Sequence, residues 1–406
     1  SPNHRFGFFP SIAVGYVVSN EKFFAPIRDV VSMVKLKASY GLVGNDQIGG
    51  DRRFIYNETV IGGGKYYFGT TPSQYTSVRL GEFPNPNVGW EKAKKLNLGA
   101  DLSFFNQLNI SVDYFKENRE GIFLQRKSIP MYVGLSTKPW VNIGKMRNSG
   151  IDASLEYHQP LGKDLHLTVR GNFTYARNRI MDQDEPDYAY TYMNHSGQMQ
   201  WQKFGLVAAG LFQDQEDIDS WAKQSFGEVK PGDIKYLDLN GDGIVDNYDT
   251  KPIGYSDIPE IVYGFGFSLQ WKAFDLSAFF QGVAHVSFST LTDQTQAFVG
   301  RNLKESSVFA DLYGNTWTPE NPGAKYPRMT TGAIDNNNQL STFWMANGRY
   351  LRLKNLELGY TLPKRIANKI AMQSLRVYLS GVNLFTFSPF KLWDPDLQTG
   401  ATNYPN

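Results

Sequence analysis

The twelve residues "DLNGDGIVDNYD" at positions 238–249 combine residue types and a spacing that suit a metal ion. Oxygen-bearing side chains occupy the first, third, fifth, ninth and twelfth positions, and glycine occupies the sixth, as in calcium loops of the EF-hand type. The backbone carbonyl of the seventh residue is a further ligand in such loops. The predicted ligands are Asp238, Asn240, Asp242, the carbonyl of Ile244, Asp246 and Asp249.

The charge of this loop favours a bound cation, because its carboxylates repel one another unless positive charge lies between them. We expect a structural calcium ion that clips a long loop with little core of its own. Asp249 replaces the usual glutamate at the twelfth position, so it either reaches the ion with one oxygen or leaves room for a water molecule. The coordination shell would then be smaller and would also admit magnesium. Pro252 argues against the second helix of an EF-hand sensor. The alternative is a solvated turn without metal, since Asn, Asp and Gly favour turns.

Signs of catalysis are few. The chain has no cysteine, its five histidines form no HExxH pattern, and no GxSxG turn is present. The stretch "TVIGGGKYY" lacks the first glycine and the Ser or Thr of a phosphate loop. We therefore expect neither an enzyme nor an organic cofactor. The net charge of +2, from 41 basic and 39 acidic residues, provides no field that would attract nucleic acid.

Aromatic residues in the long connections offer a second kind of chemistry. They stand among Asn, Gln and Asp, a mixture suited to stacking on sugar rings while hydrogen-bonding hydroxyl groups. The candidate cargo-binding residues are Tyr190, Tyr192, Trp201, Trp221, Trp317 and Trp344. The alternative for each is that it packs the loops against one another or belongs to an aromatic girdle at a membrane interface.

The elements that carry these loops are predicted to be β-strands, because apolar and polar residues alternate with period two. In "SGIDASLEYH" Ile151, Ala153, Leu155 and Tyr157 share one face. A slip of the alternation near Lys354 and Asn355 indicates a bulge. Short helices are expected only in "EDIDSWAKQS" and "KRIANKIA". The predicted strands are approximately 6–18, 33–43, 91–105, 107–124, 143–158, 163–178, 260–272, 274–288, 348–362 and 373–386.

The connections between these strands alternate between short and long. Long loops are expected at 44–90, 125–142, 179–259 and 289–347, with shorter links between them. Long loops outside and short turns in the periplasm are typical of an outer-membrane β-barrel, whose mean hydropathy can be negative, as the value of −0.39 is here. No apolar run approaches the roughly 18 residues of a spanning helix. A secreted, calcium-stabilised β protein that binds carbohydrate without transporting it is the alternative of a different class.

Strand parity places both ends of this ten-stranded sheet on the extracellular side. Barrels of this kind close with both termini in the periplasm, and open edges in lipid would leave backbone groups unpaired. We therefore expect residues 1–406 to form the C-terminal part of one larger barrel domain, without its last strand.

Several segments resemble, in order, the C-terminal half of SusC/RagA-type TonB-dependent outer-membrane transporters of Bacteroidetes. They include "RFGFFPSIAVGYVVSNEKFF", "FPNPNVGWEKAKKLNLGAD", "KPGDIKYLDLNGDGIVDNYDTKPIG", "YGFGFSLQWKAFDLSAFFQG" and "YLRLKNLELGYTLP". The resemblance covers essentially the whole sequence. It implies an all-β, antiparallel transmembrane barrel of 22 strands, of which this chain holds the second half without the plug and the TonB box.

The resemblance also implies a function. The expected activity is TonB-dependent import of a bulky nutrient across the outer membrane of a Gram-negative bacterium, with a glycan as the default cargo and an oligopeptide as the alternative. The expected partners are a SusD-like surface lipoprotein, outer-membrane lipid and, through the missing N-terminal part, the TonB–ExbB–ExbD complex.

Overall fold

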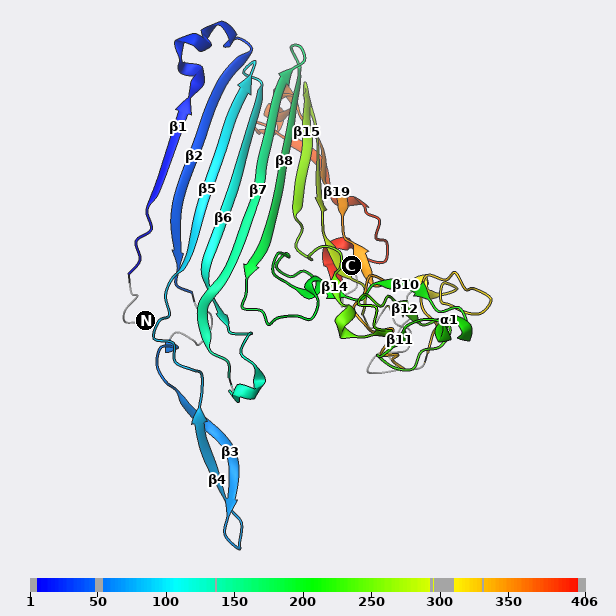
Figure 1. Cartoon of the computed structure of the whole chain (residues 1–406). Helices are drawn as coiled ribbons and strands as arrows, with labels where there is room; N and C mark the ends of the chain where they lie inside the picture. Colours follow the sequence, from blue (N-terminus) through cyan, green and yellow to red (C-terminus); the bar gives the residue numbers. More distant parts are fainter. Residues whose placement is uncertain are drawn as a thin grey trace.

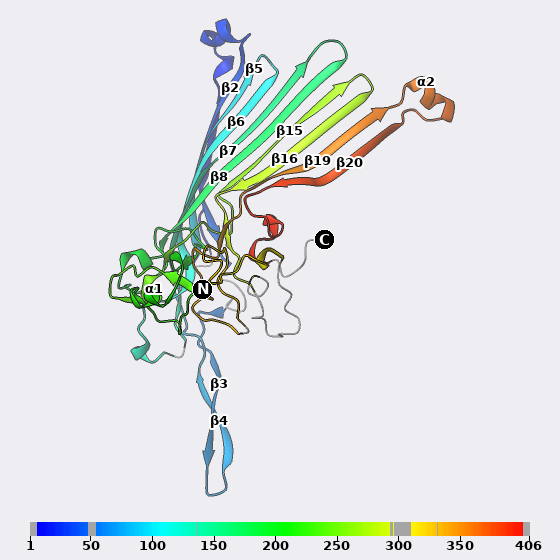
Figure 2. The same cartoon turned by 90° about the vertical axis from the view of Figure 1, so that its right-hand side faces the viewer.

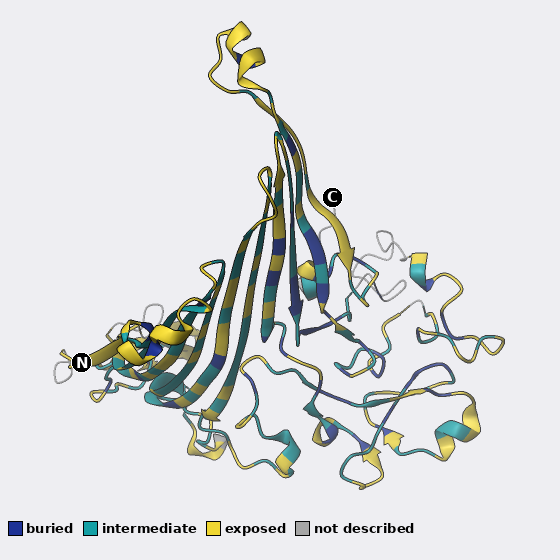
Figure 3. Cartoon of the chain, turned by 90° about the horizontal axis from the view of Figure 1, so that it is seen from above, coloured by how far each residue is buried: buried dark blue, intermediate teal, exposed yellow. Residues whose placement is uncertain are grey.

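The structure of the chain is a computed structural model that describes residues 6–47, 54–135, 137–292, 295, 310–330 and 332–400. Its main element is one ten-stranded antiparallel sheet, in which strands follow their order in the sequence with the loop segments left out. The sheet bends through an arc, and a cluster of loops lies at one end of it (Figures 1, 2 and 3). In the described part of the chain, none of the helices is long and apolar enough to cross a membrane.

All ten predicted strands are present in this sheet, with ends displaced by a few residues. The strands are β1 (Ser11–Val17), β2 (Val31–Asn45), β5 (Glu91–Phe104), β6 (Leu108–Gln125), β7 (Trp140–Pro160), β8 (Leu165–Asp182), β15 (Ile261–Trp271), β16 (Phe274–Ala284), β19 (Tyr350–Thr361) and β20 (Arg376–Phe387). Many are longer than the five or six residues usual in globular proteins, as expected for tilted spanning strands.

The register confirms that the sheet has an apolar and a polar face. Ile151 lies opposite Tyr114 of β6 and Tyr175 of β8, so one row of side chains continues across three strands. The polar face carries ion pairs between strands, such as Lys37 Nζ with Asp101 Oδ1 at 2.7 Å. Because opposite residues of an antiparallel pair share a face, the pattern of each strand reinforces that of its neighbours.

The predicted bulge lies at Lys354 of β19. Leu353 pairs with Phe280 and Asn355 with Phe279, which leaves Lys354 without a partner in the ladder. The extra residue shifts the alternation by one position, so Leu351 and Leu353 stay on the apolar face with Leu356 and Leu358. Arg352 is thereby placed on the polar face, where it binds Asp394 and Asp396.

The two ends of the sheet differ as predicted. At one end the links are short: β5 and β6 are joined through Phe105 and Asn106, both with φ near +55°, and β15 and β16 through a turn with Lys272 at φ +52°. At the other end lie the long loops, and β1 begins and β20 ends there. Within the described residues, β1 and β20 each have one neighbouring strand, so the sheet is an open part of a barrel.

The loops contain structure that alternation alone did not predict. A long hairpin of β3 (Val60–Phe68) and β4 (Ser73–Leu80) projects from the loop after β2 (Figure 1). The two expected short helices are present as α1 (Gln215–Asp219) and α2 (Lys364–Ala367). Further small strands pair within the loops: β9 (Phe204–Gly205) with β14 (Lys251–Pro252), β10 (Ala208–Leu211) with β12 (Ile234–Tyr236), β11 (Lys223–Gln224) with β13 (Ile244–Val245), and β17 (Ser287–Ser289) with β18 (Met345–Asn347).

The bulge yields the first testable prediction. Deleting Lys354 should move Leu351 and Leu353 to the polar face and Arg352 to the apolar face, where an arginine costs from about 1 kcal/mol near the interface up to about 4 kcal/mol at the midplane. We expect the deletion to abolish the folded, heat-modifiable band of the full-length protein in outer-membrane fractions. Lys354→Ala keeps the residue count and should fold normally. Equal folding of both variants would contradict this role of the bulge.

Candidate functional site: loop core, groove and acidic loop

The most deeply buried side chains of the described chain lie in the loops and not in the sheet. Residues of loop 183–260, between β8 and β15, pack with residues of loop 285–349, between β16 and β19. We call this cluster the loop core. Its buried members are Leu206, Leu211, Ile234, Tyr236, Val245, Leu312, Trp317, Tyr326 and Trp344. The expectation that loop 179–259 has little core of its own is wrong, because five of these nine buried residues belong to that loop, and a second loop distant in sequence completes the cluster.

A buried ion pair joins the two loops. Asp233 is fully buried and its carboxylate lies 2.8 Å from Arg328 Nε. The same carboxylate accepts hydrogen bonds from Asn337 Nδ2 at 2.9 Å and from the backbone N–H of Lys230 at 2.8 Å. Such a charge is tolerated in a protein interior only when it is paired and hydrogen-bonded. The requirement therefore fixes the position of both loops.

Backbone hydrogen bonds extend this connection. The N–H of Leu206 donates to the carbonyl of Leu340, and the N–H of Thr342 donates back to the carbonyl of Leu206. The amide of Asn336 donates to the carbonyl of Ile234 at 2.8 Å. The two loops thus behave as one folded unit.

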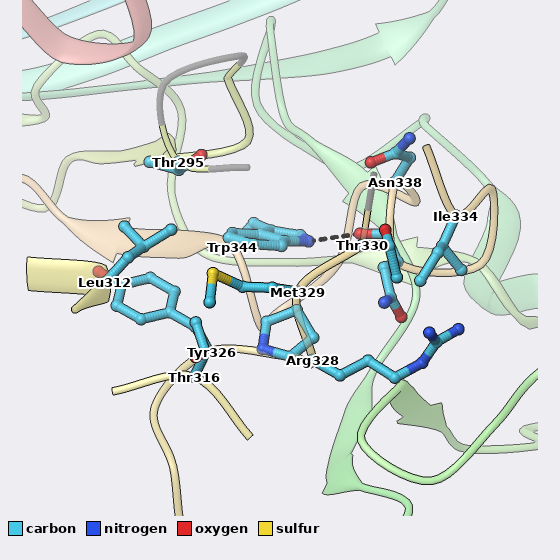
Figure 4. A pocket seen from close by; sticks show the side chains of 12 residues that line it. Thr295, Leu312, Thr316, Tyr326, Arg328, Met329, Thr330, Ile334, Asn338 and Trp344 are labelled. Carbon is cyan, nitrogen blue, oxygen red and sulfur yellow. Dashed lines mark hydrogen bonds between the residues drawn. The ribbon is translucent and has the colours of Figure 1, made fainter. Parts of the chain in front are cut away.

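Two of the predicted cargo-binding residues belong to this core. Trp344 is 2% exposed and donates its indole N–H to the carbonyl of Asn337, and Trp317 is 8% exposed. A cavity of about 40 Å³ beside Trp344, Met329 and Leu312 is too small for a nutrient molecule (Figure 4). In this conformation both tryptophans pack the two loops against each other, and Trp344 also contributes to the lining of a wider hollow beside the loops.

The other four aromatic candidates are more accessible. Tyr190 and Tyr192 stack on each other at 5.4 Å, and Tyr190 meets the edge of Tyr248 in the acidic loop. Burial and the nearby Asp249 carboxylate raise the pKa of Tyr192 above its ordinary value. Trp221 is half-buried below Lys235, whose Nζ lies 4.4 Å from the ring centroid. Trp201 is 63% exposed. The structure does not gather the six residues into one site.

A wider hollow of about 660 Å³ opens between loop 285–349 and the segment after β20. We call it the groove. It is lined by Thr290, Ala310, Asp311, Lys325, Tyr326, Phe343, Trp344, Met345, Ala346, Asn347, Pro389, Phe390, Lys391 and Leu392. Of these residues only Trp344 was a candidate from the sequence, although the stretch "SPFKLWDPD" at 388–396, rich in aromatic residues and proline, is an unusual composition for a connection.

The groove combines aromatic rings with fixed charges. Lys325 Nζ lies 2.6 Å from Asp311 Oδ2, and the Tyr326 hydroxyl donates to the same carboxylate at 2.6 Å. The ammonium group of Lys325 and this hydroxyl hold the pKa of Asp311 below its usual range. Phe390 meets the edges of Phe288 and Trp393. These contacts orient the rings before any ligand arrives, which reduces the entropy lost on binding.

In the acidic loop, the carboxylates accept hydrogen bonds from the backbone. Asp238 accepts from the N–H groups of Gly241 and Gly243 at 2.7 and 2.8 Å. Gly241 and Gly243 have φ values of +76° and +85°, which favour glycine. Asp242 accepts from the N–H of Ile244, and Asp246 from that of Tyr248.

Asp249 has a different part in this loop from the other aspartates. It is fully buried, and its two oxygens accept from the N–H groups of Leu239, Asn240 and Asp246. This carboxylate therefore fastens the end of the loop to its beginning and has little capacity left for an ion. In the described part of the chain, no three His, Asp or Glu side chains are grouped as they would be around a metal. Asp238, Asn240, Asp242, Asp246 and the Ile244 carbonyl keep the donor chemistry that calcium prefers, and the metal site stays a prediction.

Comparisons with known proteins agree with this architecture. Residues 2–384 match the family described as TonB dependent receptor-like, beta-barrel. The chain is 30% identical to TonB-dependent receptor P3 of Formosa agariphila over all of its own length and 39% of that protein. It is 26% identical to TonB-dependent receptor SusC of Bacteroides thetaiotaomicron, again over 39% of the relative. The chain thus spans about two fifths of the length of these relatives.

A solved structure has the same fold. The structure of the RagAB peptide transporter superposes with a TM-score of 0.73 at 23% identity, covering 97% of this chain and 41% of that one.

The buried ion pair gives a prediction for the loop core. Asp233→Ala should destabilise the core by about 3 kcal/mol, because removing one partner leaves Arg328 and Asn337 without their acceptor. Backbone hydrogen exchange at Ile234 and Leu206 should accelerate in the full-length protein, while exchange in β6 and β7 stays unchanged. Asp217→Ala, which removes a half-buried ion pair with Lys235, is the matched control with a smaller effect. Similar exchange rates in both variants would show that the loop core does not depend on Asp233 more than on Asp217.

The acidic loop gives a second prediction. Calcium added to the metal-free full-length protein should release heat of binding and raise its thermal stability by mass action. Asp242→Ala should lose both effects, and Asp219→Ala, an exposed aspartate of α1, should keep them. Identical calorimetric traces for the wild type and Asp242→Ala would remove the proposed site.

Proposed function

Because the chain belongs to the TonB-dependent receptor-like β-barrel family, we propose that it forms part of the barrel of a nutrient importer. Its relatives identify the SusC/RagA type and the outer membrane as its location. The secreted alternative is therefore wrong. The observation that carries the proposal is the asymmetry of the sheet: tight turns at one end and a folded loop unit with a large groove at the other. Such a unit offers a binding surface at the mouth of a barrel.

The barrel itself extends beyond these ten strands in our proposal. The relatives are about two and a half times as long as the matched region, and the edges of β1 and β20 require partners in lipid. We take the ten strands to be the second half of a 22-stranded barrel whose plug and TonB box contact the TonB–ExbB–ExbD complex. The polar face of the sheet, with its ion pairs, would line the hydrated interior.

The proposed cargo is a glycan, bound together with a SusD-like lipoprotein on the outer side. Support comes from rings beside amides and charges: the exposed Trp201, the stacked pair Tyr190 and Tyr192, and Phe343 and Phe390 in the groove. An oligopeptide is the rival, since RagAB is named as a peptide transporter. We further propose that calcium in the acidic loop is structural, stiffening the outer loops beside Tyr190 and Tyr192.

The groove provides the test. Cargo that co-purifies with the full-length protein and its lipoprotein is first identified by mass spectrometry as glycan or peptide. Phe343→Ala and Phe390→Ala should each weaken binding of that cargo about fivefold, because an aromatic contact contributes about 1 kcal/mol beyond burial. Phe105→Ala, at a turn on the opposite end, is the matched control. Unchanged affinity in both groove variants would exclude this groove as the binding site, and a co-purified peptide would replace the glycan.

A further inference from the structure

The apolar face of the sheet carries a small cluster of cations at its loop end. Lys116 lies on β6, Arg147 on β7 and Arg179 on β8, three strands that are neighbours in the sheet (Figure 1). Tyr114, Ile151 and Tyr175 form one row on the apolar face, which we call the tyrosine row. No bulge lies between this row and the three cations, so Lys116, Arg147 and Arg179 lie on the apolar face as well. We call Lys116, Arg147 and Arg179 the basic band.

The basic band includes a repulsive pair. Arg147 lies directly opposite Arg179 in the β7–β8 ladder. Like charges in such positions have Cβ atoms about 5 Å apart and destabilise a sheet. Arg147 Nε donates to Asn118 and an Arg179 terminal nitrogen to the carbonyl of Gly197, both neutral acceptors. In the described residues no carboxylate pairs with any of the three cations, whereas nearby Lys94, Lys145 and Arg177 have Glu120, Asp182 and Glu260.

The depth of the apolar face locates the band relative to lipid. Tyr175 pairs with Ile261 at the loop end of β15, and Trp271 at the turn end of β15 stacks with Phe274, which contacts Tyr360. The ten steps from Ile261 to Trp271 span roughly 33 Å along the strand, or ~25 Å after the usual tilt, which equals the apolar band of an outer-membrane barrel. On β15, Ile261 and the Trp271 cluster thus mark the two ends of the apolar band, and Tyr175 lies beside its loop end on β8.

The basic band then lies just beyond the loop end of the apolar face, within side-chain reach of the headgroup layer. Lys116 is two residues beyond Tyr114, and Arg147 and Arg179 are four beyond Ile151 and Tyr175. Along their own strands, these steps place the backbone of Lys116 roughly 5 Å and the backbones of the two arginines roughly 10 Å beyond the tyrosine row, and long cationic side chains can extend several ångströms toward the headgroups. The headgroup region is about 5–8 Å deep on each side of the hydrocarbon. The loops on the same side make this the extracellular leaflet.

From register, depth and missing counter-charge we infer that Lys116, Arg147 and Arg179 bind the phosphate group of an outer-leaflet lipid. A phosphate between Arg147 and Arg179 would turn a repulsive pair into charge-assisted hydrogen bonds, for which the guanidinium geometry is well suited. The bound lipid would hold strands β6 to β8 of the sheet in the membrane, and it would not touch the cargo. The site is separate from the groove and does not depend on the proposed import activity.

The experiment compares lipids with and without net charge. The full-length protein in neutral detergent is titrated with phosphatidylglycerol or phosphatidylcholine, and bound lipid is counted by native mass spectrometry. The wild type should prefer phosphatidylglycerol. The double variant Arg147→Gln/Arg179→Gln should bind it about 30-fold more weakly, which corresponds to about 1 kcal/mol for each arginine. Lys163→Gln also replaces a cation by glutamine, but at the exposed turn between β7 and β8, and should bind phosphatidylglycerol as the wild type does.

Two further readouts keep the result decisive. Without anionic lipid, the double variant should be as stable to heat as the wild type or more stable, because repulsion is removed; a collapse would show a structural role instead. Inorganic phosphate should compete only at concentrations far above those of the lipid. Equal binding of phosphatidylglycerol by the wild type and the double variant would overturn the inference, as would stronger binding of free phosphate than of lipid.

Discussion

The structure depends on one constraint, that every backbone N–H and C=O group of a strand in lipid must find its partner in a neighbouring strand. This constraint permits a long antiparallel sheet and fixes its register. Once register is fixed, period two assigns each side chain to the lipid or to the interior. The bulge at Lys354 shows how strictly the rule applies, since one extra residue keeps Leu351 and Leu353 on the side of Leu356 and Leu358. Arg352 gains its two aspartate partners by the same shift.

The loops obey a different requirement. Outside the membrane water can satisfy the backbone, so long connections need another source of order. They obtain it from a core of ordinary globular character, in which Ile234, Tyr236 and Trp344 are almost completely buried. Asp233 and Arg328 set the alignment of the two loops because neither charge is stable alone in that interior. The sheet and the loop core are thus stabilised by separate interactions, although they belong to one continuous chain.

This division explains how much of the molecule could be predicted. Strand positions, turn sides and the bulge follow from alternation, which can be read over a few residues. The loop core could not be predicted in that way, because Leu206 and Leu340 are 134 residues apart and no periodicity relates them. For the same reason Trp344 could be assigned to packing only in the structure. Asp249 illustrates a further limit, since spacing alone cannot show whether a carboxylate faces an ion or the amides of its own loop.

The independent core of the loops has a consequence for how such a protein can change over generations. Residues at the rim of the groove, such as Pro389 and Lys391, lie outside both the strand ladders and the Asp233–Arg328 pair. Under the proposed binding role of the groove, substitutions there would alter what it recognises while the lipid-facing sheet and the loop core keep their stability. The same proposal implies that a lineage could diversify its specificity through substitutions at the rim alone and inherit the sheet and the loop core unchanged.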